Sequence, residues 1–458
     1  MDKLLIIDEQ TINDLSIFGR SGKPSIYDLY NGTTTQGGAA ILEGLFRHPL
    51  ADERLINARS AVYQFFSSTD YSFPVDAPTI GTLAYYLENT DVRSQLQTGG
   101  QSLGQRLKDM VAADSDTVFV HDGVQACLRL CYQLSRFIHQ LRSGVGGTAY
   151  ETSFNRLVEV FGGQPFKEMR ELASAKFEVR LNQVVLAGLD KSIRFDHREK
   201  VLQLLEMLYE LDVCIAVGQV ARKRNFHFSR ALPKESEALH YKKVYHPRVD
   251  GAIANDLYLD NSHNVLFLTG ANMAGKSTLM KSVGIALYLG HIGLPVAAEE
   301  LTFAVRDGIY TSINLADNLN AGASHYYAEV LRVKEVAREL SEGKKLFVIF
   351  DELFRGTNVK DAYDATIALT RAFCSQRGSQ FIISTHIMEA GEFLEKELLP
   401  IKYRFLPTQM VGHTPVYTRV LKEGITADRQ GMLIIENEGI LEMLDAGIKE
   451  KEERICHS

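Results

Sequence analysis

The chain has 458 residues, of which 45% are hydrophobic, and its formal net charge is −7. This length exceeds one ordinary domain, and the apolar content can furnish at least two cores. No apolar run reaches the length of a membrane span, and the first residues do not have the design of a signal peptide, so we expect a cytoplasmic protein with no membrane partner. The acidic balance argues against a protein coated in positive charge for nucleic acid, but it leaves room for local basic patches.

The cysteines point to a reducing compartment, because five of them are scattered along a long chain. Cys127 and Cys131 share one face of an expected helix. Since neither has a His or Cys partner nearby in the sequence, we interpret them as core residues and not as metal ligands.

Residues 35 to 230 have a mostly helical pattern. Apolar residues recur at three- and four-residue steps in residues 118–142 and again after Asp196, which predicts two long amphipathic helices. The apolar positions of the second helix are Val201, Leu204, Leu205, Leu208, Leu211 and Ile215. Glycines at 144–147 interrupt the pattern, so we expect long helices to pair as hairpins across such turns.

The densest basic run of the chain is Arg222, Lys223 and Arg224. Cations favour the carboxyl end of a helix, so a solvated helix end is the simpler interpretation. A contact with nucleic acid is the alternative.

The helical pattern changes near Leu232 and Pro233 to short strand-like runs at 238–244 and 257–259. We therefore predict a helical domain at 1–230 and a second domain at 231–458.

The second domain opens with the most informative stretch, residues 265–278. An apolar, β-favouring run enters a Gly-rich turn, and good helix formers follow. The turn carries Gly270-x-x-x-x-Gly275-Lys276-Ser277, the pattern of a phosphate-binding loop, or P-loop. Its glycines allow positive φ, so that successive N–H groups converge on one anion at a helix N-terminus.

This pattern predicts that the chain binds the phosphates of a nucleotide together with Mg²⁺. Lys276 would reach the β- and γ-phosphates, and the Ser277 hydroxyl would coordinate the metal. The predicted nucleotide-binding residues are Gly270, Ala271, Asn272, Met273, Ala274, Gly275, Lys276, Ser277 and Thr278.

Two further apolar strands are expected to complete the site. The run 346–350 is followed by Asp351 and Glu352, and ligands gather at the carboxyl ends of buried parallel strands. Asp351 would hold Mg²⁺ through water, and Glu352 would polarise the attacking water. The run 381–384 ends before His386, which could sense the γ-phosphate or be an ordinary surface histidine.

These motifs resemble the MutS family of DNA mismatch-repair ATPases. The stretch T-G-A-N-M-A-G-K-S-T at 269–278 looks like the family's T-G-P-N-M-x-G-K-S-T, and its Asn-Met pair is unusual among phosphate loops. Residues 351–358 resemble D-E-x-x-R-G-T-S, and 384–386 resemble A-T-H. Residues 318–329 look like D-x-L-x-x-G-x-S-x-F-x-x-E, which implies that Ser324 acts on the nucleotide of the other subunit of a dimer.

The resemblance extends upstream, because residues 37–50, 211–213 and 245–247 look like the start and end of the MutS core domain. A mismatch-reading domain and its connector would lie before residue 1, and the interval before the ATPase is short for a full DNA clamp. Ala252 and Arg419 stand near positions where the family contacts adenine, so those contacts are not carried over.

The resemblance implies an N-terminal all-α lever or core domain followed by an α/β P-loop NTPase domain of the ABC-like MutS type. It also implies a DNA-coupled ATPase in mismatch repair or related DNA processing. The chain would work as a homodimer with composite sites, with Glu352, His386 and Ser324 catalytic and Ser277 and Asp351 on the metal. Any DNA binding is expected to be directed by structure or nonspecific, unless a protein partner supplies mismatch recognition.

A second hypothesis is a nucleotide-switched interaction protein that does not bind DNA, which the acidic charge favours. An ABC-type ATPase of transport or chromosome structure is disfavoured, because no L-S-G-G-Q-like signature is found and the loop has the Asn272-Met273 pair.

Overall fold

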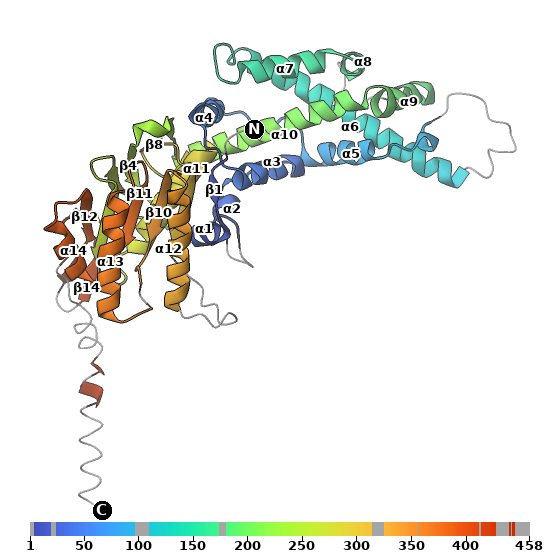
Figure 1. Ribbon diagram of the computed structural model, residues 1–458. Helices are drawn as coiled ribbons and strands as arrows, with labels where there is room; N and C mark the ends of the chain where they lie inside the picture. The colour runs from blue at the N-terminus through green and yellow to red at the C-terminus, as the bar shows by residue number, and fades with distance from the viewer. Residues whose placement is uncertain are drawn as a thin grey trace, which may run out of the picture. The chain divides into compact units, whose positions relative to one another are not determined.

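A computed structural model describes residues 4–19, 24–96, 110–173, 180–313, 325–354, 356–411, 414–426, 439–440 and 442–444. The chain divides into two compact units (Figure 1). Unit 1 consists of residues 1–26, 48–57 and 226–458, and unit 2 of residues 27–47 and 58–225. The sequence pattern predicts residues 1–26 and 48–57 as part of the helical domain, whereas in the structure they belong to unit 1.

Unit 1 is built on a seven-stranded sheet with the order β1-β9-β10-β11-β6-β12-β15. The strands are β1 (Ile6–Ile7), β6 (Val265–Gly270), β9 (Gly308–Ser312), β10 (Leu346–Phe350), β11 (Gln380–Ser384), β12 (Ile401–Leu406) and β15 (Lys422–Glu423). All neighbours are parallel except β12 and β15. The strands predicted at 265–269, 346–350 and 381–384 are confirmed. Every residue of β6, β10 and β11 is buried, which is why each reads as a continuous apolar run.

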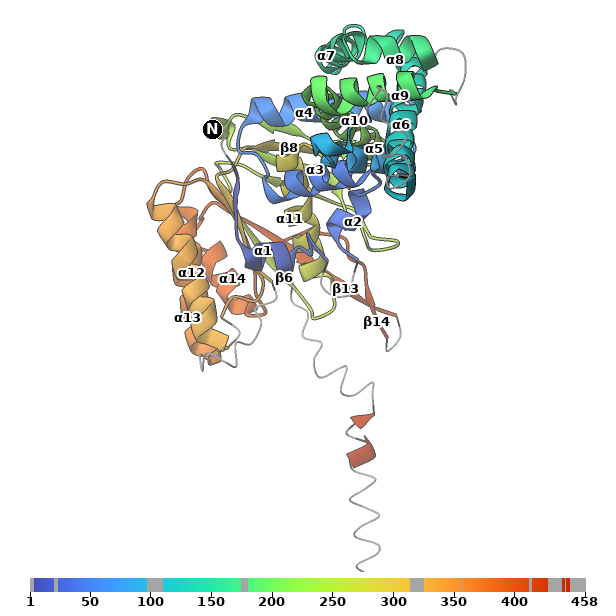
Figure 2. The same cartoon turned by 90° about the vertical axis from the view of Figure 1, so that its right-hand side faces the viewer.

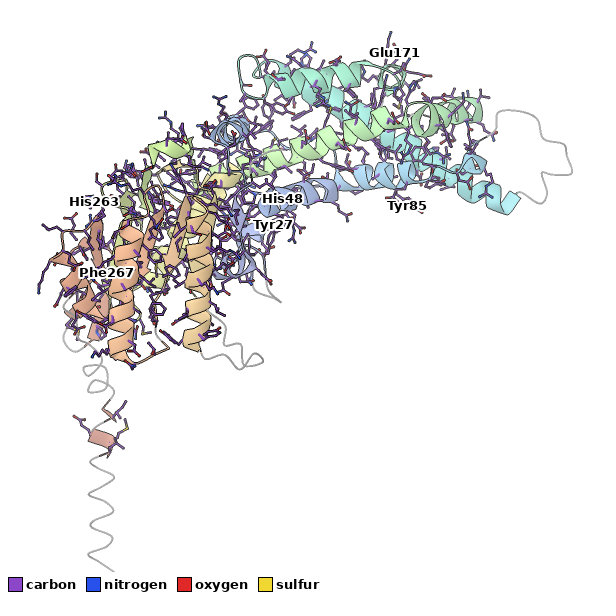
Figure 3. The ribbon with its side chains drawn as sticks, viewed as in Figure 1. Tyr27, His48, Tyr85, Glu171, His263 and Phe267 are labelled. Atoms are coloured by element: carbon purple, nitrogen blue, oxygen red, sulfur yellow. The ribbon has the colours of Figure 1, made fainter. Side chains whose placement is uncertain are left out.

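Helices cover both faces of this sheet (Figure 2). On one face, α12 (His325–Ser341) and α13 (Val359–Cys374) pack over alternate strand residues, Val348 and Phe350 of β10 among them. Phe267 of β6 belongs to the same core, and Figure 3 shows it among the strands. On the other face, α11 (Lys276–Ile292) lies so close that a Cβ on Gly284 would be 3.3 Å from Cδ1 of Ile349. The result is a three-layer α/β unit.

The remaining elements of unit 1 surround this core. A four-stranded sheet has the order β3-β8-β4-β5, β13 pairs with β14, and β2 pairs with β7. The bounds are α1 (Glu9–Asp14), β2 (His227–Phe228), β3 (Arg230–Leu232), β4 (Leu239–Val244), β5 (Asn255–Leu259), β7 (Pro295–Val296), β8 (Glu300–Ala304), β13 (Thr408–Val411), β14 (Thr414–Tyr417) and α14 (Met388–Glu395). Helix α2 (Ile26–Tyr30) begins in unit 1 and continues into unit 2.

Among its described residues, unit 2 contains helices and no strand. Its helices are α3 (Gln36–Arg47), most of α4 (Glu53–Ser67), α5 (Ala77–Glu88), α6 (Met110–Arg142), α7 (Glu151–Gly162), α8 (Phe166–Ala173), α9 (Gln183–Asp190) and α10 (Arg198–Arg224), with a π-helical turn at Lys191–Asp196. The helices predicted at 118–142 and after Asp196 are confirmed as α6 and α10. Cys127 and Cys131 are buried free thiols in α6, as expected of core residues.

The buried carboxylate of Asp212 joins α10 to the start of α3. It accepts hydrogen bonds from the backbone N–H of Thr34 (3.0 Å), from that of Thr35 (2.8 Å) and from Oγ1 of Thr35 (2.7 Å). These bonds satisfy donors that a helix N-terminus leaves without an intrahelical partner. No helix among the described residues is long and apolar enough to cross a membrane.

Candidate functional site

The site begins at the turn between β6 and α11. Gly270 has a φ of 151° and Gly275 a φ of 103°, both in the region that favours glycine. A Cβ on Gly270 would lie 3.2 Å from the carbonyl oxygen of Leu406, so the close approach of β12 also favours a glycine there. Helix α11 then starts at Lys276, with its first N–H groups at the end of the turn.

Lys276 lies folded over this turn. Its Nζ donates to the carbonyl oxygens of Gly270 (2.8 Å) and Ala271 (3.2 Å). Burial lowers the pKa of Lys276, and the negative charges of Glu352 and Asp351 oppose that shift. The turn therefore presents an ammonium group and a helix N-terminus, an arrangement suited to an anion.

Asp351 joins the start of α11 to the carboxyl ends of two strands, β11 and β9. Its Oδ2 accepts a hydrogen bond from Oγ of Ser277 (2.5 Å), and its Oδ1 accepts one from Oγ of Ser384 (2.5 Å). The backbone N–H of Asp351 donates to the carbonyl oxygen of Ser312 at the end of β9 (2.9 Å). The sequence pattern marks Ser384 only as the end of a strand and gives no sign that its hydroxyl binds Asp351.

Glu352 and His386 form a second pair beside the first. Nε2 of His386 lies 2.6 Å from Oε1 of Glu352. Glu352 has a φ of 55°, in the left-handed region, and its N–H donates to Oγ of Ser384 (3.0 Å). Ser384 therefore fixes both acidic residues, since its hydroxyl donates to Asp351 and accepts from Glu352.

The predicted residues do not all meet at one point. Lys276, Ser277, Asp351, Glu352 and His386 lie together at the carboxyl edge of the sheet. Asn272, Met273 and Thr278 are exposed, and Ala274 is buried. Ser324, predicted as a catalytic residue, lies outside the described residues.

A pocket of about 170 Å³ opens beside the turn. Met273, Gly275 and Thr278 line it on one side, and Ala252 and Arg419 are among its other walls. His246 also lines the pocket. Burial lowers the pKa of this histidine to about 4, with help from the positive charges of Lys281 and Arg248, so its ring is neutral at pH 7. The pocket is thus a half-apolar recess that adjoins an anion-binding turn.

The oxygen atoms at the site suit Mg²⁺. Mg²⁺ is usually bound by one or two carboxylates together with waters and phosphate oxygens, and not by a full protein cage. The Ser277 hydroxyl and the Asp351 carboxylate are donors of this kind, 2.5 Å apart. The described residues contain no group of three or more His, Cys, Asp or Glu that could hold a metal.

Comparisons with known proteins cover the part of the chain that holds this site. The model of MutS domain V matches residues 266–452. The DNA mismatch repair protein MutS of Listeria welshimeri is 31% identical over 247 residues, which are 53% of this chain and 28% of that protein. The corresponding proteins of Fusobacterium nucleatum and a Thermotoga species are 29% and 28% identical, with 27% and 30% of their lengths covered.

The chain therefore spans less than a third of the length of these curated relatives. The matched part runs from β6 through β10 and β11, and so contains the turn, Asp351, Glu352 and His386. Over these residues the chain is similar to MutS proteins.

Proposed function

We propose that this chain is a MutS-type ATPase, which binds and hydrolyses ATP with Mg²⁺ in a dimer and couples hydrolysis to the processing of DNA. One observation carries the proposal. The carboxylate of Asp351 is held between Ser277 of the turn and Ser384 of β11, and the pair of Glu352 and His386 lies beside it.

Phosphoryl transfer depends on positioning and on stabilisation of charge, and this site offers both. The N–H groups at the start of α11 and the ammonium of Lys276 would bind the phosphates, with Lys276 exchanging two loop carbonyls for phosphate oxygens. Ser277 and Asp351 would hold Mg²⁺, which would offset the negative charge of the phosphates. The neighbouring pocket would take the nucleobase.

Glu352 would orient and polarise the attacking water. The left-handed backbone of Glu352 and the bond from its N–H to Ser384 fix the position of its main chain. The contact with His386 fixes the direction of its carboxylate. In this proposal His386 would act through Glu352 as well as toward a γ-phosphate. Ser324 would complete the site from the second subunit, a role that rests on resemblance to the family.

Steady-state ATP hydrolysis tests the proposal. We would compare the wild type with Glu352→Ala, each alone and with paired, mismatched and branched duplex DNA. Glu392→Ala is a matched control, because Glu392 is exposed on α14. We expect turnover that one DNA form stimulates and that only Glu352→Ala abolishes. A wild type with no turnover under any of these conditions would overturn the proposal.

A second candidate is a nucleotide-switched protein that binds a protein partner and no DNA. One observation favours it. Arg222, in the densest basic run, donates to Oδ1 of Asp70 (2.6 Å) and to the carbonyl oxygen of Thr69, so part of this charge is engaged within unit 2. The run itself occupies the last turn of α10, where cations interact favourably with the helix dipole.

Retention on a DNA resin in a salt gradient separates the two candidates. Lys223→Glu/Arg224→Glu reverses two exposed charges of the run without breaking the contact of Arg222. Arg156→Glu/Lys167→Glu is the control, with the same change of charge elsewhere on exposed positions of unit 2. Retention lost only in the first variant supports DNA binding, because loss of phosphate contacts weakens binding and its salt dependence. A wild type that flows through at low salt supports the protein-partner switch.

A further inference from the structure

Residues 6–14 add strand β1 to the sheet that carries the candidate site and place helix α1 beside it, although they precede the site by about 300 residues. Strand β1 lies parallel to β9, with Ile6 opposite Gly308 and Ile7 opposite Ile309. The N–H of Ile6 donates to the carbonyl oxygen of Asp307 (2.8 Å). β1 ends at Ile7, before β9 does, so the last residues of β9 have no strand beside them on this edge.

Side chains of helix α1 supply the hydrogen-bond acceptors that a neighbouring strand would otherwise have offered to β9. The N–H of Thr311 donates to Oγ1 of Thr11 (2.9 Å), and the N–H of Ile313 donates to Oδ2 of Asp14 (2.9 Å). The same Oδ2 accepts a hydrogen bond from Oγ1 of Thr311 (2.7 Å). Thr11 and Asp14 are both buried, at 0% and 1% exposed, so these bonds form out of reach of competing water.

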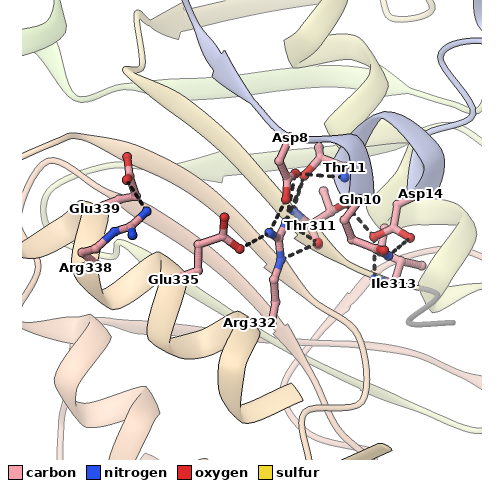
Figure 4. A network of polar contacts seen from close by, with 10 residues as sticks. All are labelled: Asp8, Gln10, Thr11, Asp14, Thr311, Ile313, Arg332, Glu335, Arg338 and Glu339. Atoms are coloured by element: carbon pink, nitrogen blue, oxygen red, sulfur yellow. Dashed lines mark hydrogen bonds and ion pairs between the residues drawn. The ribbon is translucent and has the colours of Figure 1, made fainter. Parts of the chain in front are cut away.

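Arg332 of α12 closes the network from the other side (Figure 4). Its guanidinium donates to the carbonyl oxygen of Thr311 (2.9 Å), to Oγ1 of Thr11 (3.2 Å) and to both carboxylate oxygens of Asp8. Asp8 is also the N-cap of α1, because its Oδ1 accepts from the N–H of Thr11 (3.0 Å). Helix α1, strand β9 and helix α12 therefore meet in one buried polar network.

The residues that this network binds, Thr311 and Ile313, flank Ser312, whose carbonyl oxygen contacts Asp351 of the candidate site. Side chains of α1 bind Thr311 and Ile313 on one edge of β9, and the carbonyl of Ser312 between them points to the other edge. That carbonyl accepts the N–H of Asp351 (2.9 Å). Without Thr11 and Asp14, the N–H groups of the buried Thr311 and the half-buried Ile313 would lose these acceptors, and the end of β9 would be free to shift.

We infer that Thr11 and Asp14 are positioning residues for Asp351, and that they act through the carboxyl end of β9. The inference rests on the proposed function for its effect on hydrolysis, but the structural coupling can be measured without any activity. It assigns a role in the site to a segment outside residues 266–452, the part that matches MutS domain V.

The test uses three variants and a control in the full chain. Thr11→Val keeps the shape of the side chain and removes the oxygen that accepts from Thr311, whereas Thr11→Ser retains it. Asp14→Asn replaces one of the two acceptor oxygens with an N–H donor, so the bonds from Gln10 and from the pair of Thr311 and Ile313 cannot both be kept as they are. Asn264→Ala is the control, because Asn264 donates to three carbonyls near the amino end of β11, whereas the site lies at the carboxyl ends of the strands.

The first readout is hydrogen exchange of the amide of Asp351, measured in a peptide that spans residues 346–354. The second is kcat and KM for ATP. We expect Thr11→Val and Asp14→Asn to speed this exchange and to lower kcat by about tenfold, with KM changed less than about twofold. Thr11→Ser should restore both values, and Asn264→Ala should lower the melting temperature without changing either.

The outcomes separate the two claims. If Thr11→Val matches Asn264→Ala in both exchange and kcat, the network is merely structural and the inference is wrong. If the wild type does not hydrolyse ATP, the proposed function fails, and exchange at Asp351 still decides: faster exchange only in Thr11→Val and Asp14→Asn supports the coupling, and unchanged exchange overturns it.

Discussion

Nε2 of His386 lies 2.6 Å from Oε1 of Glu352, and each residue stands two positions beyond the end of its strand, β11 and β10. Because the two strands are parallel neighbours in register, their carboxyl ends deliver both side chains to the same place. The pair has the geometry of a carboxylate whose direction is set by an imidazole.

We predict different kinetic effects from the two halves of this pair. Glu352→Gln should lower kcat roughly a hundredfold or more, because a general base is lost. His386→Asn should lower kcat about tenfold with little change in KM, because the carboxylate keeps its chemistry and loses its orientation. Steady-state hydrolysis at saturating ATP measures both. Equal losses in the two variants would mean that His386 contacts the reacting groups itself.

Lys276→Met should weaken ATP binding by about tenfold or more, since one charge-assisted hydrogen bond is worth about 1.5–3 kcal/mol. The variant also removes the bonds from Nζ to Gly270 and Ala271 that brace the turn. Titration calorimetry gives the affinity directly. Lys242→Met, in an exposed ion pair with Glu299, is the control and should bind ATP as the wild type does. Unchanged affinity in Lys276→Met would place the phosphates elsewhere.

Unit 1 should lose stability in acid through His291. This buried histidine donates through Nδ1 to the carbonyl oxygen of Leu50 (2.7 Å), because a carbonyl can only accept. Burial lowers the pKa of His291 to about 4, and the charge of Arg306 adds to this, whereas the bond to Leu50 and the charge of Asp307 oppose it. The unfolded chain, with an ordinary histidine pKa of about 6.5, then binds the proton more readily than the folded protein.

The stability contribution is therefore complete above about pH 6.5 and is lost as the pH falls toward 4, by at most about 3 kcal/mol. His291→Asn keeps a donor for Leu50 and removes the titration, so its melting temperature should fall less steeply between these pH values. His246 titrates in the same direction and leaves a residual slope. His263→Asn, at a half-exposed histidine, should retain the steep profile of the wild type. An identical profile for His291→Asn would contradict the assignment.

Unit 2 should depend on a buried ion pair. The side chains of Asp190 and Arg194 are both 0% exposed, and Oδ1 of Asp190 also accepts a hydrogen bond from the Tyr86 hydroxyl (2.6 Å). Asp190→Ala would leave a buried guanidinium without its counter-charge, so we expect a loss of about 3–5 kcal/mol in the free energy of unfolding.

Thermal unfolding followed by circular dichroism at the helical band measures this loss. Glu43→Ala removes one partner of the exposed pair with Arg47 on α3 and should cost less than about 1 kcal/mol. Asp190→Leu/Arg194→Met should recover much of the loss, since it removes both charges. A small effect of Asp190→Ala would mean that water reaches Arg194.

The strands of the site could be predicted because a strand that is buried on both faces has apolar residues at every position. Residues 346–350 are apolar at every position, and Asp351 and Glu352 follow where the strand ends. The turn before α11 is equally readable, since positive φ at Gly270 and Gly275 restricts which residues stand there.

The role of the N-terminal segment could not be predicted in this way. Strand β1 has two residues, too few for any periodicity, and its partner β9 lies about 300 residues away. The local signal for a strand here is the apolar run at 4–7, which is followed by Asp8 as the longer apolar run at 346–350 is followed by Asp351. Ser384 was missed for a related reason, because a hydroxyl at a strand end reveals its partner only when neighbouring strands are in place.

The parallel pairing of β1 with β9 also has a consequence for biosynthesis. At roughly 5–20 residues per second, the ribosome needs about 15 to 60 s to reach β9 after it has made β1. All of unit 2 is synthesised in that interval, so unit 2 can fold before β9, the partner of β1, has been made. During this time the apolar residues 4–7 are open to other chains and to chaperones, so the yield of folded protein depends on how the nascent chain is protected.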